Sequence, residues 1–292
     1  MPLRELIEAQ GIIIAPGAYD VVSAQIIERA GFPLAYITGL GNEASDLGCP
    51  DLGLTTSTEL VRRAGNVVQS VSVPVVCDAD TGFGGALNIH RTIRMFESAG
   101  VSGVHIEDQT FPKRCGVLAG KKVIPAQDFA RRVRGAVDAR ENKDFVVIAR
   151  TDAKASLGIE EAMRRLNMYV ENGADMAMVG DFYSLDEYKR IVREVKAPLV
   201  ACASCHAHFS LQPDFSVDEW KQAGVKMVLY WHLPLFAAMK AVAKVVNMLR
   251  DTGTTRQMSE ELVAYEEYEE VLRLSKWLTI DEKYGSKNLT SL

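Results

Sequence analysis

The sequence lacks the features that mark several large classes of protein. It has 5 cysteines among 292 residues, and an odd number without regular spacing does not indicate a disulfide framework. No apolar run approaches the roughly 18 residues of a membrane span. The first residues, MPLRELIEAQG, lack the apolar core of a signal peptide. We therefore expect a reduced, cytoplasmic protein without a membrane partner, although an already cleaved leader would leave a mitochondrial or other compartment open.

The sequence also has no strong excess of charge of one sign, and it lacks several catalytic motifs. The chain has 33 Lys and Arg against 38 Asp and Glu, a net charge of -5, and no dense basic block, which disfavours a nucleic-acid partner. The 5 histidines form no HExxH arrangement, and there is no Walker loop, GxSxG elbow or GxGxxG after a strand. The stretch CASCHAH, residues 202–208, is only a weak zinc pattern.

What the sequence does have is an alternation of short apolar runs with longer amphipathic ones. The short runs are almost continuously hydrophobic, which is typical of parallel strands buried on both faces. The stretches between them, such as 87–100 and 159–175, place apolar residues at intervals of three and four and predict helices. Eight such pairs predict an α/β protein with a (β/α)8 barrel of the TIM type over residues 1–250. The eight runs begin at Ile12, Leu34, Val73, Gly103, Phe145, Met176, Pro198 and Lys226.

A further helical stretch, residues 259–277, follows the eighth pair. It carries Leu262, Tyr265, Tyr268 and Leu272, which would give it an apolar face. We assign residues 251–292 to a C-terminal helical extension. The spacing alone fits packing on a neighbouring subunit and packing on the chain's own barrel equally well.

Charged side chains gather where the predicted strands end, which is the end of a barrel that carries the active site. The third run ends in Asp78 and Asp80, the fourth in Glu107 and the fifth in Arg150. Residues two apart on a strand face the same side, so the two aspartates should point together. Carboxylate oxygens suit Mg2+ or Mn2+. Salt bridges and helix N-caps are the alternative, but four charged groups at matching strand ends favour a metal site.

The loop after the fourth run, TFPKRCGVLAGKK at residues 110–122, carries a candidate catalytic thiol. Lys113 and Arg114 precede Cys115. We expect these cations to lower the pKa of the thiol, and exposure to solvent to keep it reactive. Such a thiol can act as a general acid or base, and the glycines of the loop could let it close over the barrel mouth. An inert surface cysteine is the alternative.

Together these motifs resemble the isocitrate lyase/phosphoenolpyruvate mutase superfamily, most closely its short members of the 2-methylisocitrate lyase and carboxyphosphonoenolpyruvate mutase type. The resemblance runs in order from about Ile12 to Arg250. It implies a (β/α)8 barrel whose eighth helix is exchanged between subunits, usually within a homotetramer, and so favours an extension packed on a neighbouring subunit. The matching motifs are GAYD at Gly17, LGCPDLG at Leu47, DADTGFG at Asp78, HIEDQ at His105, KRCG at Lys113 and ARTDA at Ala149.

The resemblance also implies roles for individual residues. Asp80 would be the principal Mg2+ ligand, and the cysteine of KRCG would deliver a proton to the carbon that becomes an enolate. The remaining expected groups are Asp78, Glu107 and Asp51 on metal-bound waters; Lys113, Arg114 and Arg150 with Cys115 in catalysis; and Tyr36, Thr38, Gly39, Leu40, Gly116, Gly180 and Cys202, together with Arg150, around the substrate.

Four departures from the lyase pattern fall at the far end of the substrate or on the loop. Val117 replaces the histidine of KRCGH, Gly180 stands where a glutamate is expected with Asp181 next to it, and Cys202 stands where an asparagine is expected. The stretch YWHLPLFAAMK also lacks an expected arginine. We therefore expect a Mg2+-dependent carbon–carbon lyase that forms an enolate from a small 2-hydroxy or 2-oxo (di)carboxylic acid, with a far end smaller or less charged than that of 2-methylisocitrate. A decarboxylase or hydrolase of oxaloacetate-type acids, a C–P bond mutase and, less favoured, a non-catalytic binding protein are the alternatives.

Overall fold

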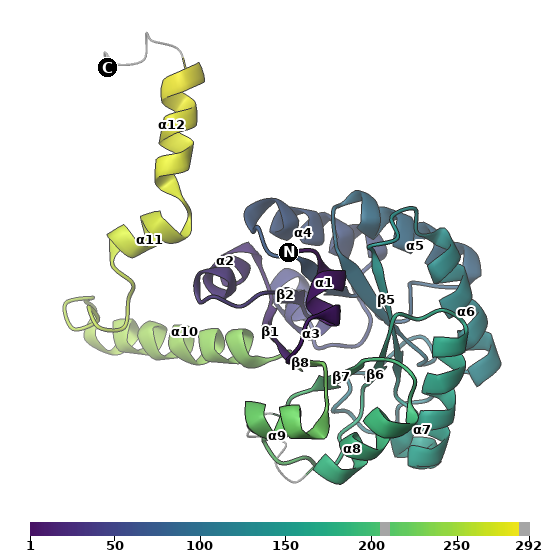
Figure 1. Cartoon of the computed structure of the whole chain (residues 1–292). Coiled ribbons are helices and arrows are strands. Elements are labelled where there is room, and N and C mark those ends of the chain that lie inside the picture. Colours follow the sequence, from purple (N-terminus) through teal and green to yellow (C-terminus); the bar gives the residue numbers. More distant parts are fainter. Residues whose placement is uncertain (205–210, 286–292) are drawn as a thin grey trace. The chain divides into compact units, whose positions relative to one another are not determined.

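Eight parallel strands close into a barrel in the computed structural model, which describes residues 1–204 and 211–285 (Figure 1). Each strand pairs with the next along the chain, and β8 pairs with β1. The predicted (β/α)8 barrel is confirmed, and all eight apolar runs contain a strand. The strands are β1 (Ile13–Ala18), β2 (Ala35–Ile37), β3 (Val75–Asp78), β4 (Gly103–Glu107), β5 (Val146–Thr151), β6 (Met176–Val179), β7 (Leu199–Cys202) and β8 (Met227–Tyr230).

Helices follow the strands and cover the outside of the barrel (Figure 1). Several begin at a capping box; Thr56 and Glu59, for example, exchange hydrogen bonds at the start of α4. Two short elements follow β2, the helix α3 (Gly39–Asn42) and a π-helical turn, Glu43–Leu47. The other helices of this part are α1 (Leu3–Glu8), α2 (Val21–Arg29), α4 (Ser57–Ser70), α5 (Ala86–Ser98), α6 (Ala126–Ala139), α7 (Lys154–Glu171), α8 (Leu185–Glu194) and α9 (Val217–Ala223).

The strand register sets polar residues side by side at the carboxyl end of the barrel. Along β4 and β5, Glu107 pairs with Arg150, and along β3 and β4, Asp78 pairs with His105. All six residues of β5 are buried, because helices cover its outer face and the packed barrel interior covers the other. The charged ends of these strands are therefore held by a rigid apolar scaffold.

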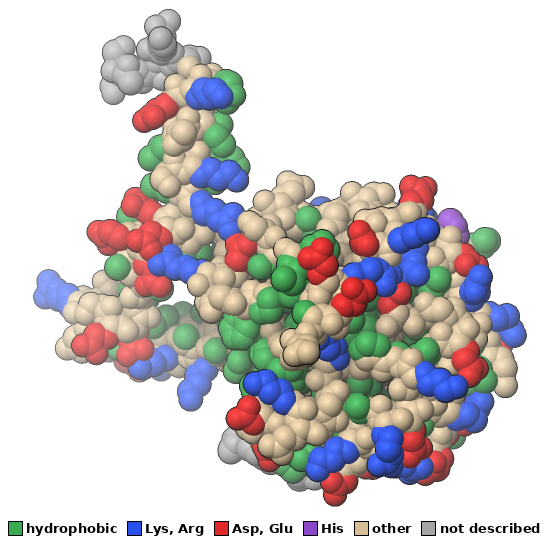
Figure 2. All heavy atoms as spheres, viewed as in Figure 1, with side chains coloured by type: hydrophobic (Ala, Val, Ile, Leu, Met, Phe, Trp, Pro, Cys, Tyr) green, Lys and Arg blue, Asp and Glu red, His purple; other side chains and the backbone are tan. Residues whose placement is uncertain are grey.

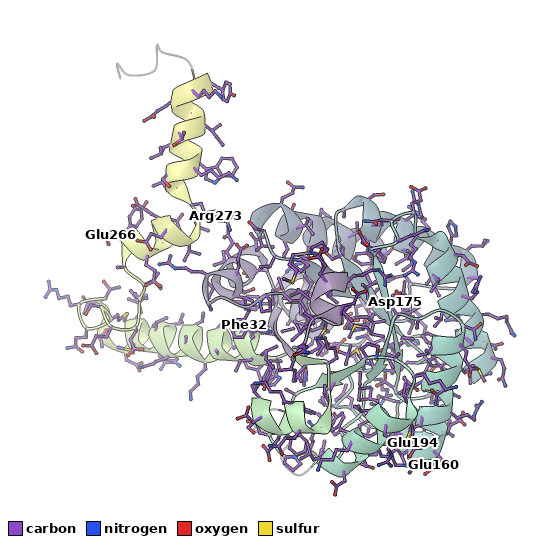
Figure 3. The ribbon with its side chains drawn as sticks, in the orientation of Figure 1. Phe32, Glu160, Asp175, Glu194, Glu266 and Arg273 are labelled. Carbon is purple, nitrogen blue, oxygen red and sulfur yellow. The ribbon has the colours of Figure 1, made fainter. Side chains whose placement is uncertain are left out.

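The opposite end of the barrel is closed by α1. Leu3 is buried in a cluster that includes Val146 and Met176. Arg4 donates to Asp175 Oδ1 at 2.9 Å, and Arg140 donates to Asp175 Oδ2 at 2.6 Å. Asp175 is labelled in Figure 3. This carboxylate ties the N-terminal helix to the barrel floor.

The chain divides into two compact units, Met1–Leu235 and Phe236–Leu292. The second contains most of α10 (Leu233–Thr252), with α11 (Tyr265–Val271) and α12 (Leu274–Tyr284). The single helix predicted over 259–277 is wrong: Arg273 has a φ of 57° and separates two short helices. The extent of the extension from residue 251 and its packing on a neighbour stay predictions.

Hydrophobic side chains are exposed along α10 and α12 of the second unit (Figure 2). Val246 on α10 is 58% exposed and Trp277 on α12 is 62% exposed. Within residues 1–204 and 211–285, no helix is both long enough and apolar enough to cross a membrane.

Candidate active site

A cavity of about 40 Å³ opens at the carboxyl end of the barrel. A space of this size holds a few waters or a small organic acid. Most of the substrate-binding residues predicted from the sequence line it. The lining residues are Tyr36, Thr38, Leu40, Asp51, Asp78, Cys115, Gly116, Val117, Arg150, Met178, Gly180, Phe182, Cys202 and Trp231.

Asp78 and Asp80 lie together beside the cavity, as predicted, but the reason differs from the one given by strand periodicity. The strand ends at Asp78, and Asp80 adopts a left-handed backbone conformation with a φ of 46°. Its amide donates to Asp78 Oδ1 at 2.9 Å. A non-glycine residue in this region is uncommon and costs conformational energy, so the turn after β3, and not the strand, aims the second carboxylate.

The amide of Gly39 donates to Asp78 Oδ2 at 3.3 Å. Thr38 and Leu40, on either side of it, line the cavity, whereas Gly39 itself faces the aspartate. The predicted cluster of substrate-binding amides is thus divided: one amide orients Asp78, and the two flanking residues face the cavity.

Lys113 brings a positive charge into the aspartate cluster. Its ammonium lies 2.8 Å from Asp80 Oδ1 and also pairs with Asp51, and all three side chains are buried. Asp51 sits on a loop held by Glu43, whose carboxylate accepts hydrogen bonds from the amides of Leu52, Leu54 and Thr55. Glu43 is a positioning residue that sequence reasoning missed. No sequence pattern around this acid indicates that its carboxylate bonds to the amides of a following loop.

Cys115 is buried, and the prediction of an exposed thiol of low pKa is wrong. The residue is only 7% exposed, and its amide donates to the carbonyl oxygen of Asp51 at 3.1 Å. Burial, with a further contribution from the Asp51 carboxylate, raises the pKa of the thiol to about 12. Lys113 favours the thiolate only weakly because its charge is already paired with two carboxylates. At neutral pH the thiol is therefore protonated.

Arg114 turns away from the cavity. Its guanidinium donates to the carbonyl oxygen of Ala119 at 3.0 Å, while its backbone exchanges hydrogen bonds with the side-chain amide of Gln109. The structure thus places Arg114 on the outer side of the loop, where it stabilises the loop's shape. The cation in the flanking pair that reaches the site is Lys113.

Arg150 lies at the centre of a buried chain of ion pairs. Its Nε and Nη2 donate to Asp152 at 2.8 and 3.0 Å, and its Nη1 lies 3.0 Å from Glu107 Oε2. Asp152 also accepts from Lys121 Nζ at 2.9 Å. Despite burial, the pairs with Arg150 and Lys121 lower the pKa of Asp152 below its usual value. Asp152 and Lys121 were not singled out from the sequence, although ARTDA and the loop that contain them were.

Tyr36 lines the cavity and bonds to a buried histidine behind it. The Tyr36 hydroxyl lies 2.9 Å from His105 Nε2, and His105 Nδ1 lies 3.5 Å from Asp78 Oδ1. Burial is the main cause that lowers the pKa of His105 well below its usual value, so the imidazole is neutral. The pair fixes the tyrosine hydroxyl at the edge of the acidic cluster.

The far wall of the cavity is apolar. Val117, Met178, Phe182 and Trp231 line it, and the Trp231 indole donates to the carbonyl oxygen of Ala203 at 3.0 Å. Cys202 belongs to the same wall, and burial raises its pKa to about 11, which keeps its thiol neutral. Sequence reasoning missed Met178, Phe182 and Trp231; the available signal was their position at the ends of the sixth and eighth apolar runs. Cys205, His206 and His208 of the weak zinc pattern lie outside the described residues.

Whether a divalent cation fits at the barrel mouth depends on the charged groups there. Burial is the main cause of a raised pKa at three of these carboxyl groups. The pKa of Asp78 is raised, the pKa of Asp80 is raised to about 6, and the pKa of Glu107 is raised well above its usual value. Glu107 Oε1 accepts no hydrogen bond from the described residues. The mouth thus carries more acid than base, and its oxygen donors suit Mg2+ or Mn2+. The buried acids are Asp51, Asp78, Asp80, Glu107, Asp152 and Asp181, against the cations Lys113, Lys121 and Arg150.

No group of three carboxylate, thiol or imidazole side chains encloses a metal site within residues 1–204 and 211–285. The metal ligands expected from the sequence, Asp80 with Asp78, Glu107 and Asp51, therefore stay a prediction.

Comparisons with known proteins match almost the whole chain. A family model described as phosphoenolpyruvate phosphomutase matches residues 3–250. A 2,3-dimethylmalate lyase of Eubacterium barkeri is 36% identical over 284 residues, 97% of each chain. A 2-methylisocitrate lyase of Aeropyrum pernix is 39% identical over 270 residues, 92% of this chain and 86% of the relative.

Solved structures are similar over the same length. Oxaloacetate acetylhydrolase in complex with 3,3-difluorooxalacetate has a TM-score of 0.91 at 32% identity, covering 99% of this chain and 97% of that one. Phosphonopyruvate hydrolase in complex with oxalate and Mg2+ has a TM-score of 0.85 at 28% identity, covering 97% of this chain and 98% of that one.

Proposed function

Because the chain belongs to the isocitrate lyase/phosphoenolpyruvate mutase superfamily of lyases, mutases and hydrolases, we propose that it is a Mg2+-dependent carbon–carbon lyase. The proposed substrate is a small 2-hydroxy or 2-oxo dicarboxylic acid without a further charged group at its far end. The proposed reaction passes through an enolate. The assignments of residues to roles below are part of the same proposal.

Asp80 would hold Mg2+ directly, with Asp78, Glu107 and Asp51 on its waters. The bound ion would stabilise negative charge as it develops on a substrate oxygen. Lys113 supplies a protein cation at the same carboxylates. It keeps the cluster partly neutralised when the loop is closed.

For a 2-hydroxy acid, we assign one role each to Arg150, Asp78 and Cys115. Arg150 binds a substrate carboxylate through the N–H groups that Asp152 leaves available. Asp78 accepts the proton of the 2-hydroxyl group, the adjacent carbon–carbon bond breaks, and its electrons remain on the departing carbon as an enolate. The Cys115 thiol donates its proton to that carbon. The products are a 2-oxo acid and a saturated acid, and solvent carries the proton from Asp78 back to the thiolate.

The observation that carries this proposal is the buried thiol of Cys115 in the same small cavity as Arg150 and Asp78. A thiol with a pKa of about 12 is a poor nucleophile at neutral pH because almost none of it is thiolate. It remains a far stronger acid than the carbon it would protonate. Its burial under the closed loop also keeps water from competing for the enolate.

The apolar far wall supports a substrate with an alkyl group at that end. A third carboxylate, such as that of 2-methylisocitrate, placed against Val117, Phe182 and Trp231 would lose its water without gaining a cation, at a cost of several kcal/mol. 2,3-Dimethylmalate, named for the relative from E. barkeri, is such an acid, because it has two carboxylates and only a methyl group as the further substituent on the departing carbon. We expect poor turnover of 2-methylisocitrate.

The test is a panel of 2-hydroxy and 2-oxo acids with Mg2+, with products identified by NMR in D2O. A lyase gives a 2-oxo acid and a saturated acid that carries one deuterium on the former enolate carbon. Cys115→Ser should reduce turnover by roughly 10²- to 10⁴-fold, the usual contribution of a general acid. Full activity of this variant would remove the thiol's role, and efficient cleavage of 2-methylisocitrate would refute the specificity.

Hydrolysis or decarboxylation of an oxaloacetate-type acid is the second candidate, favoured by the close structural similarity to oxaloacetate acetylhydrolase. The same panel separates it, because oxaloacetate would then give oxalate and acetate, or pyruvate and CO2. A C–P bond mutase would rearrange phosphoenolpyruvate or phosphonopyruvate. Tight oxalate binding without any product would indicate a binding protein.

We also propose that the second unit packs on neighbouring subunits to form a homotetramer. Met239, Val242 and Val246 are each more than half exposed and recur at intervals of three and four along α10. Exposed apolar rows of this kind are typical of surfaces buried between subunits. Light scattering of the purified protein should give four times the chain mass, and a monomer would contradict the assembly.

A further inference from the structure

The loop that carries Cys115 has a fixed base. The Thr110 amide donates to the carbonyl oxygen of Lys122 at 2.8 Å, and the Ile124 amide donates to that of Asp108 at 2.9 Å. These bonds fasten the two ends of the loop together where it leaves β4. Beyond this base, Lys113 pairs with Asp51 and Asp80, and the Cys115 amide donates to the carbonyl oxygen of Asp51.

Lys121 makes such a contact at the far side of the loop from Lys113. Its ammonium lies 2.9 Å from Asp152 Oδ1 and 2.5 Å from Asp181 Oδ1, and all three side chains are buried. Asp181 Oδ2 in turn accepts from the amide of Ala155 at 3.3 Å. Because Lys121 does not line the cavity, this contact is not part of the substrate pocket itself.

The same carboxylate of Asp152 clamps Arg150 through two hydrogen bonds. Bidentate pairing fixes the plane of a guanidinium, and so fixes where its remaining N–H groups point. Without Lys121, two buried carboxylates would face each other with one cation fewer, and their repulsion would shift Asp152, together with the guanidinium bonded to it, away from Asp181.

Backbone contact closes the arrangement. A Cβ added to Gly116 would lie 2.8 Å from the carbonyl oxygen of Gly180 and 3.3 Å from Arg150 Nη2. The loop therefore rests directly against Arg150 in the position that Lys121 holds. Loop closure and the orientation of Arg150 share one ionic contact.

We propose that Lys121 is a positioning residue that couples closure of the 110–122 loop to the orientation of Arg150 through Asp152. The proposal rests on the proposed function only in that Arg150 receives the substrate carboxylate. Lys121 acts at a distance from the reacting atoms, so its loss raises the KM of the substrate and the Kd of a small dianion more than it lowers kcat.

The test compares Lys121→Met with Lys121→Arg and with Lys122→Met, a matched control at the exposed neighbouring lysine. Hydrogen exchange of the 110–122 peptide is measured by mass spectrometry without ligand, and oxalate binding by calorimetry with Mg2+. Lys121→Met should exchange faster in the loop and bind oxalate roughly 10- to 100-fold more weakly, the usual range for a group behind a ligand-binding residue. Lys121→Arg should recover part of both losses, and Lys122→Met should match the wild type.

Unchanged exchange and unchanged oxalate affinity in Lys121→Met would overturn the proposal, as would equal losses in Lys122→Met. If Lys121→Met does not fold, Asp181→Asn removes one of its two acceptors and should give the same two changes at smaller size; a folded Asp181→Asn with neither change would also overturn it. Loop exchange and oxalate binding that respond as described, in a wild-type protein that gives no lyase product, would refute the proposed reaction and leave the coupling intact.

Discussion

The two ends of the barrel both contain buried or half-buried ion pairs, but the carboxylates at the two ends differ in how fully their oxygens are paired. At the floor, Asp175 accepts hydrogen bonds from Arg4, Arg140 and the amide of Val147, so both of its oxygens have donors. At the mouth, buried acids outnumber buried cations, and Glu107 keeps an oxygen that accepts no hydrogen bond from the described residues.

The contrast distinguishes charged groups that stabilise the fold from charged groups that are suited to binding a ligand. A carboxylate whose oxygens all have hydrogen-bond donors, as at Asp175, stabilises the fold without a ligand. An excess of buried carboxylate costs free energy in the empty protein and is retained where a bound cation or substrate offsets it. The following predictions test this division, from the largest expected effect to the smallest.

The thiol of Cys115 should be nearly inert at neutral pH because it lies in the negatively charged, desolvated mouth. With a pKa of about 12, its thiolate fraction at pH 7 is on the order of 10³-fold below that of an ordinary cysteine, and it rises tenfold for each pH unit. Alkylation of Cys115 by iodoacetamide, followed by mass spectrometry between pH 7 and 9, should show this slope. Cys49, a partly exposed free thiol, is the internal reference; equal rates at pH 7 would contradict the account.

Gly180→Ala should damage the mouth without unfolding the barrel. A Cβ at this position would lie 2.3 Å from Arg150 Nε and 2.5 Å from Asp152 Oδ1, so the pair must separate. We expect kcat/KM to fall by roughly 10- to 100-fold, as when a charged hydrogen bond is lost.

Gly135→Ala is the matched control for that change. Gly135 lies inside α6, and an added Cβ there meets no atom within 4 Å. Alanine should stabilise the helix by about 1 kcal/mol and leave kcat/KM unchanged. If both variants lose activity equally, the steric argument at Gly180 is wrong.

Asp175→Ala should affect stability alone. Removing the carboxylate frees Arg4 and Arg140 at the barrel floor and should lower the free energy of unfolding by about 2 kcal/mol, the scale of charged hydrogen bonds that are partly screened by water. Denaturant unfolding measures the loss, and kcat should stay within a factor of two. A large fall in kcat in the folded variant would show that the two ends of the barrel are not independent.

The barrel was predictable because each strand is an almost unbroken apolar run, and parallel strands buried on both faces leave that signature. The strand ends also indicated Asp78, Glu107 and Arg150, since a barrel brings all its strand ends to one mouth. The cations beside it singled out Cys115, and the motif resemblance supplied Asp51; both residues lie on loops without periodicity.

What the sequence could not give was the direction of side chains outside regular elements. Lys113 and Arg114 are adjacent and chemically similar, yet one enters the acidic cluster and the other bonds to Ala119. The burial of Cys115 depends on the position of the loop, in which the Cys115 amide bonds to Asp51 and Lys113 pairs with Asp51 and Asp80. Local composition near a cysteine predicts its pKa only when the loop leaves it in water.

Calorimetric titration of the protein with Mn2+ and Mg2+, with and without oxalate, tests the central claim most directly. The account predicts one ion per chain, bound more tightly in the presence of oxalate, and no measurable binding in a folded Asp80→Asn variant. A flat titration of the wild-type protein under both conditions, or binding that Asp80→Asn leaves unchanged, would contradict the claim that the acids at the mouth hold a divalent cation.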